Sequence, residues 1–116
     1  MNIAKNIERG SNLFPNKPAL IFEGKYFTYK HLNEMVNRAA NALKELGIKR
    51  GERVALFLPN IPEFIISYLG IQKIGAIAVS INVSLQEDEV KFILDDCQAK
   101  ALITTPQLYD KISQTD

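Results

Sequence analysis

The chain has 116 residues, the size of one small domain, which excludes multidomain machinery within it. Hydrophobic residues make up 47% and charged residues 23%, which suffices for a packed core and argues against disorder. The net charge of +1, without a clustered basic stripe, argues against nucleic acid as a partner. The only cysteine, Cys97, can form no internal disulfide, which favours a reducing compartment.

Charge and hydropathy vary along the chain. Residues 1–53 hold ten cations and five acids, and residues 54–116 hold four cations and eight acids, a pattern typical of two solvated faces of opposite sign. The apolar stretch 64–83 has Gln72 and Lys73 at its centre, so two buried elements are expected there and no membrane span. The first residues lack the apolar core of a signal peptide, and the cytoplasm is the expected location.

The N-terminal region predicts a helix followed by a hairpin. Residues 1–18 are expected to form a first helix, near 3–13, and a loop that contains two prolines. The apolar and aromatic runs 19–22 and 26–28 are joined by a turn around Gly24, where glycine permits a positive φ. This pattern indicates a small antiparallel hairpin.

Residues 29–46 contain the clearest helical pattern in the chain. Thr28 is placed to cap the first turn, and Gly47 is placed to end the helix with a left-handed residue. The predicted apolar stripe consists of Leu32, Met35, Val36, Ala39, Ala40, Leu43 and Leu46.

Beyond this helix, apolar strands alternate with helices. Buried strands are predicted at 53–58 and 76–81, and a third strand at 101–104. The helix after the first strand is expected to have Asn60 as its N-cap. Ser84 and Glu87 have the spacing of a capping box, so Ser84 is expected to cap the next helix. Thr105 and Pro106 open a last helix that carries Leu108, Tyr109 and Ile112.

Strict alternation of this kind predicts an α/β fold. The expected architecture is a small parallel sheet built from right-handed βαβ units, with flanking helices and an N-terminal β-hairpin. After residue 116 such a pattern normally continues to another strand. The chain is therefore expected to be an incomplete piece of a larger domain, without an internal boundary.

Ligands of parallel sheets bind at the carboxyl ends of the strands, which here are the loops 59–60, 82–84 and 104–106. The six glycines form no phosphate-binding loop, because neither the GxGxxG nor the GxxxxGK[ST] spacing occurs. His31 has no second histidine or cysteine near it in the sequence, so a solvated histidine is expected rather than a metal ligand.

The remaining chemical candidates have structural explanations. Ser84 is interpreted as a helix cap, because no nucleophile elbow surrounds it. The acids Glu87, Asp88 and Glu89 are favoured by the dipole at the start of a helix. Cys97 lies on an apolar stripe and is expected to be buried, and Tyr29, Tyr68, Met35 and the phenylalanines have core spacings. No catalytic, cofactor-binding or metal residue is assigned.

Several stretches, in this order, nevertheless resemble the N-terminal part of the AMP-forming acyl-activating enzymes, the superfamily of acyl-CoA synthetases, luciferases and peptide-synthetase adenylation domains. They are PNKPAL at 15–20, FTYKHLN at 27–33, NRAANAL at 37–43, LGIKRGERVA at 46–55, PNIPEF at 59–64, GIQKIGA at 70–76 and LDDCQAK at 94–100. The resemblance covers about residues 15–104. Each motif is weak alone, and their order is specific.

The resemblance implies a parent enzyme in which a carboxylate and ATP form an acyl-adenylate with Mg²⁺ present, after which a thiol displaces AMP. Residues 1–116 would be part of its N-terminal AMP-binding domain. The family's phosphate loop, ribose-binding aspartate and catalytic lysine have no counterpart here, so no functional residue is carried over. The piece itself is expected to be inactive and to bind no cofactor, whereas the parent uses ATP, Mg²⁺ and CoA.

Three positions depart from the family pattern. His31 stands where a glutamate completes the capping box, and Ser80 stands where a proline is frequent. Ser84 stands where the family often has a cation that reaches a phosphate, which places that contact in doubt. Asn82 favours the acyl-CoA synthetase branch over the amino-acid adenylation domains.

A fatty or related acid CoA ligase is the preferred interpretation. A ligase that loads a carrier protein, an amino-acid adenylation domain and a non-enzymatic α/β interaction module are the alternatives. The expected partners are the rest of the ligase chain and, for the isolated piece, a second copy of itself, because a small cut sheet exposes strand edges.

Overall fold

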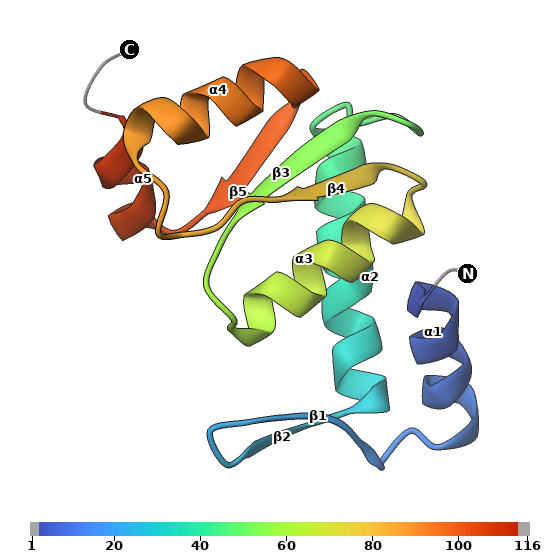
Figure 1. The fold of residues 1–116 in the computed structure, drawn as a ribbon. Helices are drawn as coiled ribbons and strands as arrows, with labels where there is room; N and C mark the ends of the chain where they lie inside the picture. The colour runs from blue at the N-terminus through green and yellow to red at the C-terminus, as the bar shows by residue number, and fades with distance from the viewer. Residues whose placement is uncertain (1–2, 114–116) are drawn as a thin grey trace.

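The computed structural model describes residues 3–113 and confirms the predicted α/β fold (Figure 1). The elements, in chain order, are α1 (Ile3–Leu13), β1 (Pro18–Phe22), β2 (Lys25–Thr28), α2 (Tyr29–Glu45), β3 (Arg53–Phe57), α3 (Pro62–Lys73), β4 (Ile77–Ser80), α4 (Glu87–Cys97), β5 (Ala101–Thr104) and α5 (Pro106–Ile112). No helix among these residues is long and apolar enough to cross a bilayer.

The strands form two separate sheets. β1 and β2 form the predicted antiparallel hairpin, in which Glu23 and Gly24 adopt φ values of 49° and 80° at the turn. β3, β4 and β5 form a parallel sheet in the order β4-β3-β5. The hairpin lies at the start of α2, far from the three-stranded sheet (Figure 1).

The central strand β3 is buried on both faces, as predicted, because helices cover it from two sides. One hydrophobic cluster joins Val54 and Leu56 to residues of α2 and α3, including Leu43 and Ile71. A second cluster joins Ala55 and Phe57 to residues of α4 and α5, including Val90 and Ile112.

The prediction that 76–81 is a second buried strand is wrong for its central part. The strand is shorter, Ile77–Ser80, and it lies at an edge because β3, not β4, occupies the centre of the sheet. Ile77 is 47% exposed. A uniformly apolar run does not distinguish an edge strand from a central one, because the difference depends on the pairing order.

The helix α2 has the predicted ends. The Thr28 hydroxyl accepts a hydrogen bond from the backbone N–H of His31 at 3.1 Å, and Gly47 has a φ of 90°. The stripe is correct except at its last residue: Leu46 is the C-cap and is 73% exposed, because it lies beyond the last helical turn.

Two further side-chain expectations are corrected. Cys97 is half-buried rather than buried, and its Sγ lies 3.7 Å from the carbonyl oxygen of Leu94. Two phenylalanines are not core residues as expected: Phe92 is 69% exposed and Phe14 is 48% exposed. Phe92 lies on the side of α4 opposite the apolar stripe that covers the sheet. His31 is exposed and stacks on Phe27, with ring centroids 6.0 Å apart.

Candidate functional site at the carboxyl edge of the sheet

A cleft of about 460 Å³ opens where β3 and β4 end, at the edge of a parallel sheet where ligands usually bind. Its lining consists of Leu58, Pro59, Asn60, Phe64, Ser80, Ile81, Asn82 and Val83. Two of the three loops that the sequence indicated, 59–60 and 82–84, therefore meet in one cleft. The hydrogen bond from the Ile81 N–H to the Leu56 carbonyl, at 2.8 Å, fixes the second loop to β3.

The loop after β4 is built around the side chain of Asn82. Its Oδ1 accepts hydrogen bonds from the backbone N–H of Ser84 at 2.9 Å and from the Ser84 hydroxyl at 2.8 Å. The two bonds form an Asx turn. The N-cap of α4 is Gln86 and not Ser84, so the predicted role of Ser84 as a helix cap is wrong. The Ser84 hydroxyl donates to an amide oxygen, which is not a general base that could activate it as a nucleophile.

The helix α4 begins three residues after Ser84 because its cap is Gln86. The Glu89 carboxylate accepts a hydrogen bond from the backbone N–H of Gln86 at 3.0 Å, in a capping box between these two residues. The neighbouring Glu87 forms an ion pair with Lys91 at 3.2 Å. Glu87 and Glu89 therefore have structural partners. All three acids lie in the first turn of α4, where the helix dipole favours negative charge.

The loop after β3 also differs from its prediction. Ile61, not Asn60, is the N-cap of α3, and no side chain caps it. Pro62 occupies the first helical position, where its missing N–H costs nothing, so the helix starts one residue later than expected. Asn60 is exposed and contributes to the cleft.

The end of β5 is bonded to the end of β3, the strand that leads into the cleft. The Thr104 hydroxyl donates a hydrogen bond to the carbonyl of Phe57 at 2.7 Å, and Thr105 caps α5 through the N–H of Leu108 at 3.2 Å. The Lys111 ammonium donates to the carbonyl of Val83 at 3.0 Å. This cation binds the loop to α5 and does not line the cleft.

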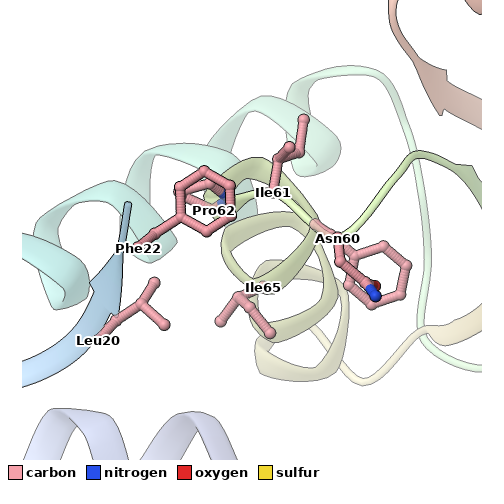
Figure 2. A pocket seen from close by; sticks show the side chains of 7 residues that line it. Leu20, Phe22, Asn60, Ile61, Pro62 and Ile65 are labelled. Atoms are coloured by element: carbon pink, nitrogen blue, oxygen red, sulfur yellow. The ribbon is translucent and has the colours of Figure 1, made fainter. Parts of the chain in front are cut away.

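A second hollow, an apolar groove of about 210 Å³, lies between the hairpin and the start of α3. It is lined by Leu20, Phe22, Asn60, Ile61, Pro62, Phe64 and Ile65. Figure 2 shows Leu20 and Ile65 facing each other across it, with Phe22 beside Pro62. The sequence did not indicate this groove, because its two walls are some forty residues apart in the chain.

Neither hollow fits a nucleoside triphosphate or its magnesium ion. No Lys, Arg, Asp or Glu side chain lines either hollow. Within residues 3–113, no group of three His, Cys, Asp or Glu side chains could hold a metal ion. The cleft offers amide and hydroxyl groups on an apolar floor, an arrangement suited to a neutral polar contact and not to phosphate charge.

Comparison with known proteins gives one consistent match. The family described as AMP-binding enzyme matches residues 7–116. Crotonobetaine/carnitine–CoA ligases of Salmonella paratyphi A and Salmonella typhimurium are 45% identical to this chain over 104 residues, in matches that cover 85% of this chain and 20% of each ligase. The chain thus spans about a fifth of the length of the curated relatives that it matches.

Solved structures agree with this match. A fatty acyl CoA synthetase of Mycobacterium tuberculosis superimposes with a TM-score of 0.88 at 35% identity, over 98% of this chain and 24% of the synthetase. An anthranilate CoA ligase solved with anthranoyl-AMP superimposes with a TM-score of 0.90 at 36% identity, over 97% of this chain and 22% of the ligase.

Proposed function

Because this chain belongs to the AMP-binding enzyme family, we propose that it is the N-terminal part of an ATP-dependent ligase that couples a carboxylic acid to coenzyme A. The observation that carries the proposal is the 45% identity to crotonobetaine/carnitine–CoA ligases over 104 residues. The match includes both loops of the cleft, so the similarity extends to the part of the fold that faces ligands in parallel sheets.

The proposed reaction has two steps. A carboxylate oxygen attacks the α-phosphorus of ATP, and the bond to pyrophosphate breaks. The CoA thiol then loses its proton and attacks the acyl carbonyl carbon, and AMP leaves with the electrons of the broken bond. Mg²⁺ is expected to neutralise phosphate charge in the longer enzyme. No residue described here is assigned to either step.

In this proposal, residues 1–116 form one scaffold unit, in which 1–18 supply the first helix and loop. The hydrogen bonds of Asn82, Thr104 and Lys111 hold the loops at the carboxyl edge in fixed positions. Later segments of the enzyme would bring the phosphate-binding and catalytic groups to this edge. The isolated chain is therefore inactive in this proposal, because neither hollow carries a charge for a phosphate or a metal.

The acid and the acceptor are narrower parts of the proposal. The ligases and synthetases named above support CoA, rather than a carrier protein, as the acceptor thiol. A fatty or related acid is the proposed substrate class. The proposed location is the cytoplasm, in keeping with the single half-buried thiol and the use of ATP and CoA.

A grafted enzyme tests the proposal. In the Salmonella typhimurium ligase, the 104 matched residues are replaced by the corresponding part of this chain, and CoA thioester formation from carnitine or crotonobetaine is measured. The graft should retain activity within about tenfold of the unmodified ligase, a change of about 1.4 kcal/mol in barrier.

A control graft carrying Leu56→Asp should lose activity, because it buries an unpaired charge in the central strand. A graft that folds with the melting temperature of the unmodified ligase but forms no thioester would contradict the proposed role. Such a result would favour the α/β interaction module instead.

A further inference from the structure

The peptide group between Val83 and Ser84 is held at both of its polar ends. The Val83 carbonyl accepts a hydrogen bond from the Lys111 ammonium at 3.0 Å. The Ser84 N–H donates to the Oδ1 atom of Asn82 at 2.9 Å. In a trans peptide, the C=O and N–H groups lie in one plane and point in opposite directions, so the two bonds together fix this plane. The Lys111 side chain therefore acts on Asn82 through a single rigid peptide group.

Lys111 reaches the loop from a fixed base. It lies in the last turn of α5, 28 residues after Val83, and its side chain is half-buried. The loop that leaves β4 passes beside this helix (Figure 1). The neighbouring Ile112 and Leu108 pack in the hydrophobic cluster on one face of β3. The position of the ammonium is thus set by the packing of α5 on the sheet.

The same bonds decide which atoms of Asn82 are left for a ligand. Its Oδ1 accepts from both the N–H and the hydroxyl of Ser84, and an amide oxygen has two acceptor sites. A backbone N–H can only donate, so the amide atom that it meets is the oxygen and not the nitrogen. The Nδ2 atom, with two N–H donors, is left for other partners. Asn82 lines the cleft, which has no charged side chain in its lining. Its amide is therefore suited to an uncharged oxygen acceptor.

We infer that Lys111 is a positioning residue of the proposed ligase. Its ammonium holds the peptide group after Val83, this peptide holds the Asn82 amide, and Nδ2 of Asn82 donates to an uncharged carbonyl oxygen of a substrate in the cleft. The acyl carbonyl of the adenylate and the amide carbonyls of CoA are oxygens of this kind. The inference rests on the proposed function, because it needs that reaction's substrates.

The chemistry of the side chain separates positioning from packing. A methionine at position 111 is unbranched and keeps the apolar contacts of the lysine stem, but it has no donor for the Val83 carbonyl. Arginine keeps a charged donor. A charge-assisted bond to the carbonyl is stronger than a neutral one, and it polarises the peptide so that the Ser84 N–H becomes a better donor. The loop therefore depends on the donor at position 111 and not on the bulk of the side chain.

Order parameters from NMR relaxation test the tether in the 116-residue chain itself. The backbone amide of Ser84 should have an order parameter of about 0.85 in the wild type and below about 0.6 in Lys111→Met. Lys111→Arg should keep the wild-type value. Lys91→Met is the matched control, because it removes the ammonium of another half-buried lysine, which pairs with Glu87 on α4, and it should leave Ser84 rigid. A Ser84 amide that stays equally rigid in Lys111→Met would overturn the inference.

Steady-state kinetics test the effect on the reaction. The graft into the Salmonella typhimurium ligase is extended to residue 113, so that it includes Lys111. Lys111→Met should raise the KM for the acid or for CoA about tenfold, equivalent to about 1.4 kcal/mol, and leave kcat and the KM for ATP within about twofold. Lys111→Arg should restore most of the affinity, and Lys91→Met should change none of these constants. A KM for ATP that rises as much as the others would indicate general damage and overturn the inference.

Asn82→Asp tests the last step of the argument. The aspartate keeps an oxygen that accepts the Ser84 bonds, but it replaces the two Nδ2 donors with a second oxygen. It should raise the same KM as Lys111→Met. The double variant should show less than the product of the two single effects, because both act through one amide group. Effects that multiply would overturn the route through Asn82.

The unsubstituted graft separates this inference from the proposed function. A graft that forms no thioester before any substitution would overturn the proposed function. An active graft whose KM values are unchanged by Lys111→Met would overturn the role of Lys111 and leave the proposed function standing.

Discussion

The Cβ atom of Ala39 lies 2.9 Å from the position that a β-carbon on Gly70 would occupy. The backbone nitrogen of Ala40 is only 3.2 Å from the same position. The helices α2 and α3 therefore approach so closely at this point that only hydrogen fits on one side. The crossing orients α3, whose first turn forms a wall of both hollows.

Gly70→Ala should destabilise the fold in spite of alanine's better helix propensity. The clash costs about 1–3 kcal/mol, and the propensity returns up to about 1 kcal/mol. Urea unfolding at one fixed protein concentration measures the net loss. Combined with Ala39→Gly, which removes the clashing methyl group, the substitution should cost less than the sum of the two single changes. Additive costs would show that the two positions do not clash.

Stability should respond differently to removal of the Thr28 hydroxyl, which caps a helix, and of the Ser84 hydroxyl, which does not. Thr28→Ala removes the acceptor of the His31 N–H and should cost about 1 kcal/mol. Ser84→Ala leaves the Asn82 side chain bonded to the Ser84 backbone and should cost less than about 0.5 kcal/mol. Urea unfolding compares the two variants directly. Equal losses would mean that Ser84 caps α4 after all.

Thr104→Val should weaken the end of the sheet at the cleft. The change keeps the shape of the side chain but removes the hydroxyl that donates to the Phe57 carbonyl, at a cost of about 1–2 kcal/mol. Thr104→Ser is the control, because it keeps the donor and loses only a methyl group of a half-buried side chain. Thermal unfolding should rank the proteins wild type, serine variant, valine variant, in falling order of stability. A valine variant as stable as the wild type would contradict this role of the hydroxyl.

The isolated chain should show no exchange of labelled pyrophosphate into ATP with any of a panel of carboxylic acids. The reason is that no cation lines the cleft or the groove. A sample without protein sets the background. Exchange above this background, abolished by Leu56→Asp, would show that the chain has an active site of its own and would contradict the scaffold role.

Much of the fold follows from local patterns. The period of the apolar residues predicted α2 and β3, and single residues with special backbone preferences marked their ends, as Thr28, Gly24 and Gly47 do. These signals work because a helix cap or a tight turn depends on neighbours within about four residues. The order of the motifs was likewise sufficient to identify the family.

The first residue of a helix was harder to predict where more than one nearby residue could serve as its N-cap. Asn60 and Ser84 are both common N-cap residues, yet α3 and α4 begin at Pro62 and Glu87. At the second site, Ser84 belongs to the Asx turn of Asn82, and the capping box is formed two residues later by Gln86 and Glu89. Such a choice depends on the whole loop and on where the preceding strand leaves the sheet.

The sequence by itself determined the element order, the parallel sheet and the family. Only the tertiary structure decided that β3 lies between β4 and β5, and hence that Ile77 is at an exposed edge. It also decided that Leu20 and Ile65 form one groove (Figure 2). The physical reason is that the spacing of hydrophobic residues shows the type of an element and which of its faces is apolar. The order of the strands and the contact between distant segments depend on long-range packing.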